Sequence, residues 1–293
     1  MEDFPTEINN YREIFLGGGS VLLTVLSKIQ KGEINVRGHI YAYDLNEPLI
    51  HVYKNIQTKH EELYGLLRSL IDEFNSCRDE TDKEKINRKP ATLEEAKLTK
   101  ENYYYWTRIQ YNKLSLADQK KPMGSAMFIF LNKTCFRGVF RVGPNGFNVP
   151  YGHYNQPEII NKAHLDEIHA LIQGVIFSAK DFVDSLADVE DDDFVYLDPP
   201  YAPETSLSFV GYTEKGFGID QHTKLFQLIH QLTAADKKIM MSNADVTLVR
   251  ENFASDEPSN KYTIASILCK RSINSKNPSA KAKEVIIKNY SLS

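Results

Sequence analysis

The pattern of apolar and polar positions at the start of the chain predicts a βαβ unit. Residues 11–15 form a short run of β-forming residues, and a glycine-rich turn, Leu-Gly-Gly-Gly-Ser, follows at 16–20. Apolar residues then recur at helical spacing over 21–29, and a second β-rich run at 39–43 leads to Asp44. A strand, a glycine turn, a helix and a further strand in this order are typical of a parallel sheet.

The rest of the chain continues this alternation, with a less regular block in its middle. The further elements that the pattern predicts are helices at 47–74, 159–176 and 219–232 and strands at 194–197, 238–243 and 284–290. A Gly-Pro-Asn-Gly turn at 143–146 separates two short β-like runs and predicts a hairpin. The aromatic residues at 103–106 are expected to belong mostly to the core.

Composition narrows the class of protein. With 293 residues, of which 42% are hydrophobic and 25% charged, the chain is long enough to bury a sizeable core. Its three cysteines are widely spaced without a CxxC pair, so we expect no metal site and a reducing compartment such as the cytoplasm of a bacterium or the host of a virus. No apolar run approaches the roughly 20 residues of a membrane span. The polar N-terminus does not have the pattern of a signal peptide.

Charge is distributed unevenly along the chain, although the net charge of −4 argues weakly against a nucleic-acid partner. Residues 261–293 contain seven Lys or Arg and one acid, and 131–153 contain three Lys or Arg and no acid. Residues 181–204 contain nine Asp or Glu and no Lys or Arg. A chain with this segregation can present a basic surface while it is acidic overall. An ordinary solvated face is the alternative for the C-terminal cluster.

Polar residues with a possible chemical role follow two of the first predicted strands. The glycines at 17–19 allow a tight turn and a close approach of the backbone to a ligand, next to a helix N-terminus. Neither GxGxxG nor GxxxxGK[ST] is present, so a nicotinamide site or a P-loop is not supported. Asp44 has the position of an acid that accepts hydrogen bonds from ribose hydroxyls. The alternative is that it caps the N-terminus of the next helix.

A third group, Asp198-Pro199-Pro200-Tyr201, stands at the end of the apolar run 194–197. Two prolines have no N–H for the sheet and fix the backbone, so the strand ends rigidly there. A carboxylate, free carbonyl oxygens and an aromatic ring within four residues suit the recognition of a planar ring that bears an amino group. Because ligands bind at the carboxyl ends of parallel strands, these four residues are the predicted catalytic centre.

These groups resemble the motifs of the Dam-like adenine-N6 DNA methyltransferases of the D12 class. The matching segments are FLGGGSV at 15–21, DLNEPLI at 44–50, NKTCFRGVFRV at 132–142, FNVPYG at 147–152, SAKDF at 178–182, YLDPPY at 196–201, GF and DQ within 216–221, SN at 242–243 and EVIIKNY at 284–290. They follow in the order that the family shows and cover almost the whole chain. This collinearity is more specific than any single motif.

The resemblance implies S-adenosylmethionine as cofactor and no metal. The residues that it assigns to the cofactor are Phe15, Gly17, Gly19, Asp44, Asn46, Asp181, Phe182 and Asp198. The glycine loop would lie at the methionine end, Asp44 at the ribose, and Asp181 with Phe182 at the adenine ring. Asp198 and the Pro199 carbonyl would accept the two hydrogens of the target amine, with the flipped base stacked on Tyr201.

Double-stranded DNA is the implied partner of the central block. The residues expected to bind it are Asn132, Lys133, Phe136, Arg137, Arg141 and Arg271. Arginine can pair with guanine through two hydrogen bonds or can hold phosphate. The Phe136 ring would either insert between bases or pack in the core.

Two departures from the family pattern bear on activity and specificity. Relatives usually carry a Lys-x-x-Gly-Gly-Lys segment before the cofactor loop, and the 14 residues before Phe15 contain none. We expect either a truncated chain or another group over the cofactor. Relatives commonly have Asn where Arg137 and Gly143 stand, which predicts a recognition sequence that can differ from GATC.

The sequence thus predicts a site-specific, adenine-N6 DNA methyltransferase of a restriction-modification type. The predicted fold is α/β, a Rossmann-like sheet of the S-adenosylmethionine-dependent kind with an inserted, mostly helical recognition domain that contains a hairpin. We expect a methyltransferase domain at 1–56 and 166–293 and the recognition domain at 57–165, in a monomer or weak dimer that has no membrane segment. The alternatives are a cytosine-N4 methyltransferase, an RNA or protein methyltransferase and a catalytically silent DNA-binding relative.

Overall fold

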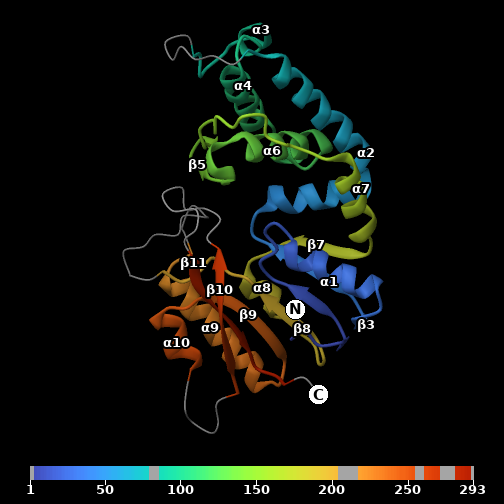
Figure 1. Ribbon diagram of the computed structural model, residues 1–293, viewed down its shortest axis with the longest axis vertical. Helices are drawn as coiled ribbons and strands as arrows, with labels where there is room; N and C mark the ends of the chain where they lie inside the picture. Colours follow the sequence, from blue (N-terminus) through green and yellow to red (C-terminus); the bar gives the residue numbers. More distant parts are fainter. Residues whose placement is uncertain (1–2, 79–85, 204–216, 255–260, 271–280, 292–293) are drawn as a thin grey trace. The chain divides into compact units, whose positions relative to one another are not determined.

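The computed structural model describes residues 3–78, 86–203, 217–254, 261–270 and 281–291. The chain forms two compact units. Unit 1 consists of residues 1–45 and 174–293, and unit 2 of residues 46–173. The sheet lies in unit 1, while unit 2 is mostly helical (Figure 1).

A seven-stranded sheet with the order β10-β11-β9-β8-β2-β4-β7 forms the centre of unit 1. Its strands are β2 (Tyr11–Glu13), β4 (Ile40–Asp44), β7 (Val175–Ala179), β8 (Phe194–Leu197), β9 (Lys238–Ala244), β10 (Thr263–Lys270) and β11 (Lys281–Lys288). The five strands from β9 to β7 are parallel, and β11 pairs antiparallel with both β9 and β10. Two short strands, β1 (Glu7–Ile8) and β3 (Asn35–Val36), form a separate parallel pair. The predicted α/β class with a mostly parallel sheet is confirmed.

Helices cover the sheet and bury its apolar side chains. The helices of unit 1 are α1 (Ser20–Gln30), α8 (Phe182–Leu186), α9 (Ile219–Ala234) and α10 (Thr247–Phe253) (Figure 1). Alternate residues of β8 and β9, such as Val195 and Met241, share a core cluster with Phe226 of α9 and Phe253 of α10. Because strand side chains alternate between faces, the intervening residues, such as Tyr196, point to the opposite face.

Strand order reverses between β2 and β8. From β2 the chain proceeds through β4 to β7 on one side, and it then returns to β8 and β9 on the other side of β2. The carboxyl ends of β2 and β8 are therefore neighbours at a topological switch point, where open α/β sheets bind ligands. The whole of unit 2 lies in the connection between the adjacent parallel strands β4 and β7.

Unit 2 is a helical unit with one small hairpin. Its elements are α2 (Glu47–Ser76), α3 (Leu93–Ala96), α4 (Lys100–Lys113), α5 (Leu116–Gln119), α6 (Pro122–Thr134), the 3-10 helix η2 (Phe136–Gly138), β5 (Val142–Gly143), β6 (Gly146–Phe147) and α7 (Lys162–Leu171). Helix α2, which is interrupted by non-helical backbone at Lys59, packs along α6. Phe74, Tyr103 and Phe130 are buried between α2, α4 and α6, with edge-to-face contacts of Phe130 to the other two rings. The predicted hairpin and the predicted burial of the aromatic segment of α4 are confirmed.

The predicted helix 159–176 is wrong at its C-terminal end. Helix α7 stops at Leu171, and residues from Val175 onward form strand β7. The C-cap of α7 is Ile172, and Gly174, with a left-handed φ of 83°, redirects the chain into β7. The sequence prediction also lacked β1, β3, β10 and α10 and began β11 three residues late. No helix in the described part of the chain is long and apolar enough to cross a membrane.

Candidate active site

The glycine loop follows β2 and adopts a conformation that requires glycine. Gly17 and Gly19 have φ of +49° and +69°. A side chain at Gly17 would meet no atom within 4 Å, so the backbone angle and not the available space selects glycine there. The Gly17 amide donates a hydrogen bond of 2.9 Å to Oδ2 of Asp44, and the Leu16 amide donates to the Tyr43 carbonyl. The loop is thus fixed to the end of β4, with Asp44 beside it as predicted.

The N-cap alternative for Asp44 is excluded. Helix α2 begins at Glu47, and its N-cap is Asn46, whose side chain accepts a hydrogen bond from the Leu49 amide at 3.3 Å. Asp44 belongs to β4 and contacts the glycine loop instead. Asn46, which the resemblance assigns to the cofactor, thus caps α2 through its side-chain oxygen.

Glu13 is a buried carboxyl directly before the glycine loop that the sequence prediction missed. It is 2% exposed, and the Tyr11 hydroxyl donates to it at 2.7 Å. It also accepts from the Leu22 amide in the first turn of α1, a helix whose N-cap residue, Gly19, has no side chain to offer. Burial raises the pKa of Glu13 to about 8, and the nearby Asp198 contributes in the same direction. Glu13 thus links β2 to the start of α1 and fixes the two ends of the loop.

Three aromatic rings from distant parts of the sequence meet beside the glycine loop. Phe15 stacks on Phe182 with ring centroids 6.0 Å apart, and Phe217 lies 5.7 Å from each of them. Asp181, immediately before Phe182, caps α8 by accepting from the Val183 amide at 2.8 Å. Phe15, which the resemblance places at the methionine end of the cofactor, and Phe182, which it places at the adenine ring, thus lie together with Phe217, which had only been part of a motif.

His222 packs against this ring cluster from α9. Its ring lies 4.8 Å from that of Phe217 and is fully buried. Burial lowers the pKa of His222 to about 4, so the imidazole is neutral at pH 7. In the described part of the chain neither ring nitrogen has a hydrogen-bond partner.

Asp198 stands at the carboxyl end of β8 with its side chain exposed. Ser242 on the neighbouring strand β9 donates a hydrogen bond of 2.6 Å to Oδ1 of Asp198. Partial burial among protein atoms raises the pKa of Asp198, the Ser242 hydrogen bond lowers it, and the charge of Glu284 raises it again. An accessible carboxylate with an elevated pKa at a strand end is typical of a functional site.

The residues after Asp198 are held by strands β9 and β11. The Tyr201 hydroxyl donates to Oε2 of Glu284 at 3.1 Å, and the Ala202 amide donates to Oδ1 of Asn243 at 2.9 Å. Pro199 is buried and Tyr201 is half-buried. Side chains from two other strands thus fix the segment that carries the predicted catalytic residues.

The predicted DNA-binding residues of unit 2 gather around η2 and the hairpin. Phe136 is 48% exposed, which excludes the core alternative. The Arg137 guanidinium lies 5.1 Å from the centre of the Phe136 ring, and Arg137 has a left-handed φ of 59°. Arg141 donates to Oδ1 of Asn148 at 2.7 Å across the hairpin. Their side chains are therefore held at the surface by local contacts.

The other three predicted DNA-binding residues show no comparable arrangement of exposed, fixed side chains in the described part of the chain. Asn132, on α6, donates to the Gly138 carbonyl at 2.8 Å and so holds η2 against the end of that helix. Lys133 is exposed on α6. Arg271 lies outside the described residues.

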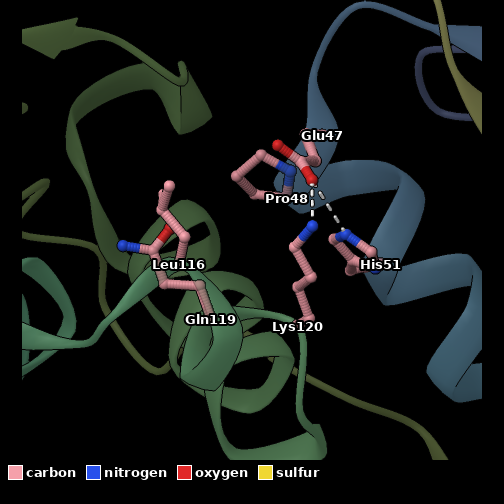
Figure 2. A pocket seen from close by; sticks show the side chains of 6 residues that line it. All are labelled: Glu47, Pro48, His51, Leu116, Gln119 and Lys120. Atoms are coloured by element: carbon pink, nitrogen blue, oxygen red, sulfur yellow. Dashed lines mark hydrogen bonds and ion pairs between the residues drawn. The ribbon is translucent and has the colours of Figure 1, made fainter.

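Two other polar clusters of unit 2 are closed ion pairs. Figure 2 shows Lys120 and His51 both pointing toward Glu47, whose Oε1 is 2.6 Å from the Lys120 Nζ and 3.4 Å from the His51 Nε2. The Lys120 hydrogen bond lowers the pKa of Glu47. In the second cluster, His60, Glu61 and Asp166 have a spacing suited to a metal ion, but the Lys162 ammonium bridges the two carboxylates at 2.9 and 2.5 Å. Lysine therefore supplies the positive charge in both clusters.

Comparison with known proteins shows the family to which the chain belongs. A sequence model of the D12 class N6 adenine-specific DNA methyltransferases matches residues 1–273. The chain is 33% identical to a Type II methyltransferase, M.MjaIII, of Methanocaldococcus jannaschii, over 99% of this chain and 93% of that protein. The chain belongs to this family.

Other members agree with this assignment. The Type II methyltransferase M1.LlaDCHI of Lactococcus lactis subsp. cremoris is 28% identical over 98% of this chain and 88% of its own length. The DNA adenine methylase of Escherichia coli K12 is 27% identical over 82% of this chain and 73% of its own length. The predictions of the D12 family and of an enzyme that methylates adenine in DNA site-specifically are confirmed. The cytosine, RNA, protein and silent alternatives find no support in these matches.

Proposed function

We propose that this D12 methyltransferase uses S-adenosylmethionine and binds the N6 amine of a flipped-out adenine at Asp198. The observation that carries the proposal is the position of Asp198. It is an exposed carboxylate at the end of β8, and this strand end lies next to the glycine loop at the switch point of the sheet.

The residues around the glycine loop fit S-adenosylmethionine by their chemistry. Asp44 is an acceptor suited to ribose hydroxyls, and the rings of Phe15, Phe182 and Phe217 offer apolar surface for a purine. Gly17 and Gly19 keep the loop free of side chains where the methionine part would lie. When bound, S-adenosylmethionine supplies an activated methyl group on its sulfonium. We assign the adenine amine of the cofactor to Asp181.

Asp198 and the Pro199 carbonyl would prepare the target amine for attack. The lone pair of N6 is delocalised into the adenine ring, so the free amine is a weak nucleophile. Two acceptors that draw its hydrogens out of the ring plane localise the lone pair on nitrogen and stabilise the positive charge that develops there. Asp198 would then hold the proton that the nitrogen loses. Pro200 fixes the backbone, and Tyr201 offers a ring for the flipped base.

Unit 2 is proposed to be the target-recognition domain for duplex DNA. Support comes from the exposed Phe136 and the basic residues Arg137 and Arg141 around η2 and the hairpin. Arg141 is positioned by Asn148, which favours a directed contact with a base or a phosphate. The sequence-based boundaries at 57 and 165 fall inside this unit, which extends over 46–173.

Methylation of plasmid DNA tests the proposed activity. The wild-type protein with S-adenosylmethionine is expected to produce N6-methyladenine at one sequence motif, mapped by sequencing. Asp198→Ala is expected to reduce turnover at least about a hundredfold, because an acceptor for the transition-state charge is lost. Its affinity for S-adenosylmethionine should remain within a few-fold of wild type. N4-methylcytosine, or an unchanged rate in Asp198→Ala, would contradict the assignment.

Arg141→Ala tests the DNA-binding role of unit 2. The variant is expected to bind duplex DNA more weakly and to reduce the slope of log affinity against log salt concentration by about 1, because one phosphate or base contact is lost. Lys89→Ala, which removes an exposed lysine of the same unit, is the matched control. Equal affinity and slope in Arg141→Ala and this control would remove Arg141 from the interface.

A further inference from the structure

The carboxylate of Asp198 has two oxygens in different surroundings. Oδ1 accepts the short hydrogen bond from Ser242. Within the described ranges of the chain, Oδ2 accepts none from the protein. Since one oxygen is occupied on the side of β9, the other is left for a ligand at the exposed end of β8.

The direction of the Ser242 hydrogen bond is set by a second hydroxyl. Tyr196 on β8 lies on the same face of the sheet, and its hydroxyl is 3.3 Å from Oγ of Ser242. Ser242 has one proton to donate, and its other possible acceptor, the Leu197 carbonyl, is 3.4 Å away. The Ser242 Oγ lies 2.6 Å from Oδ1 of Asp198, so the carboxylate is the preferred acceptor. Ser242 therefore accepts a hydrogen bond from the Tyr196 hydroxyl and donates its own to Asp198.

We propose that Ser242 is a positioning residue for the methyl transfer: its hydroxyl holds Oδ1 of Asp198 so that Oδ2 faces the amine of the target base. The inference rests on the proposed function of Asp198. It concerns a residue that is buried, at 5% exposure, and that cannot itself reach solvent or substrate freely.

The electrostatic surroundings of Asp198 give Ser242 a second effect. The titratable groups that face this carboxyl are Glu13 on β2, Tyr196 on β8, Tyr201 after β8 and Glu284 on β11. None of them is a cation, and Ser242 is the neighbour whose hydrogen bond lowers the pKa of Asp198. Because the ionised carboxylate is the stronger acceptor for the amine and the form that can take up its proton, the Ser242 hydrogen bond favours the reactive form of Asp198.

The first test measures Asp198 without turnover. Carbon-13 NMR of the full chain labelled at the aspartate carboxyls follows the Asp198 signal with pH in wild type and in Ser242→Ala, and Asp198→Asn identifies the signal. Loss of a hydrogen bond to a charged group is expected to raise the apparent pKa of Asp198 by about one unit. Ser242→Thr, which keeps a hydroxyl, should restore the wild-type titration. An unchanged titration in folded Ser242→Ala would overturn the proposal.

The second test measures the reaction. In Ser242→Ala the acid limb of kcat/KM against pH should move up by the same amount, kcat should fall about tenfold, and KM for S-adenosylmethionine should stay within a few-fold. Tyr196→Phe removes the donor to Ser242 and leaves Ser242 in place, so a smaller change in the same direction is expected. It also remains informative if Ser242→Ala fails to fold.

The two tests separate this inference from the proposed function. An inactive wild-type protein with the expected NMR shift would overturn the proposed reaction and leave the hold of Ser242 on Asp198 intact. An active wild-type protein whose pH profile is unchanged in Ser242→Ala and in Tyr196→Phe would overturn the role of Ser242 alone.

Discussion

The two ends of strand β8 carry an aspartate each, and the two residues have opposite surroundings. Asp193, just before the strand, is fully buried. Its carboxylate accepts five hydrogen bonds, from Arg12, from the Asn10 amide and side chain, from Asn9 and from the Glu190 amide. Asp198, just after the strand, is exposed and, among the residues that the structure describes, accepts a hydrogen bond from Ser242 alone. Identical side chains, separated by the four residues of β8, thus differ in what they can still bind: Asp193 is saturated by the protein, whereas Asp198 keeps an oxygen for the proposed reaction.

The difference follows from how a parallel sheet is built. At the amino ends of the strands, Arg12 is buried with Asp193 at 2.7 Å and stacks over Tyr41, so the charges are compensated and closed off from solvent. At the carboxyl ends the chain leaves the sheet at the switch point between β2 and β8, and within the described residues the Asp198 carboxylate there is paired through Oδ1 to Ser242. A saturated carboxylate has no acceptor capacity left for a substrate, whereas a partly paired one does.

Removal of Asp193 is expected to have the largest effect on folding. Asp193→Ala leaves Arg12 buried without its main partner and should lower the free energy of unfolding by about 3 to 5 kcal/mol, measured by urea titration. Asp198→Ala should change it by less than about 1 kcal/mol, although methyl transfer is lost. Asp188→Ala is the matched control, because Asp188 also binds Arg12 but is 63% exposed, and less than about 1 kcal/mol is expected. Equal losses in all three variants would break the comparison.

Glu13 extends the comparison to β2, with a smaller and pH-dependent effect. Its pKa is about 8 when folded and near 4.5 when the side chain is exposed, so its stabilising contribution is complete below pH 4.5 and is lost as pH rises toward 8. Between pH 4.5 and pH 7, the unfolding free energy of wild type should therefore fall by about 3 kcal/mol relative to that of Glu13→Gln, as measured by urea titration.

The control for Glu13 is Glu251→Gln, which alters an exposed glutamate of unit 1. Its stability curve should run parallel to that of wild type. If the unfolding free energy of Glu13→Gln also follows that of wild type at every pH, Glu13 is ionised in the folded protein at pH 7. The contrast between buried and exposed carboxyls then does not extend to β2.

The sequence predicted those parts of the site that are encoded by short local patterns. The glycine loop, the strand before Asp198 and the hairpin of β5 and β6 each depend on residues a few positions apart, so periodicity and turn signals were sufficient. Asp44 was ambiguous because ribose binding and N-capping both place an acid after a strand. The course of the chain to Asn46, which takes the capping role, excludes the N-cap alternative, and ribose binding by Asp44 stays a prediction.

Contacts that depend on strand order could not be predicted. Ser242 lies 44 residues from Asp198, and Glu284 lies 83 residues from Tyr201. Their proximity requires β9 beside β8 and β11 inserted antiparallel next to β9, and a single sequence does not encode which strands become neighbours. Phe217 meets Phe15 for the same reason. The end of the predicted helix 159–176 failed because apolar residues 175–177 fit either a helix or a strand, and Gly174 decided for the strand.

The connection between β4 and β7 has a consequence for how such enzymes can diversify. Adjacent parallel strands need a crossover of only about a dozen residues, and here that crossover is the whole of unit 2. The hydrogen bonds described above for Asp198, Ser242 and the glycine loop come from strands β4, β8 and β9 of unit 1, whose pairing does not pass through the crossover. Unit 2 is therefore exchangeable in principle: a chimaera that replaces residues 46–173 by the corresponding segment of a relative is expected to keep the strand pairs β2–β8 and β8–β9 around the proposed catalytic Asp198.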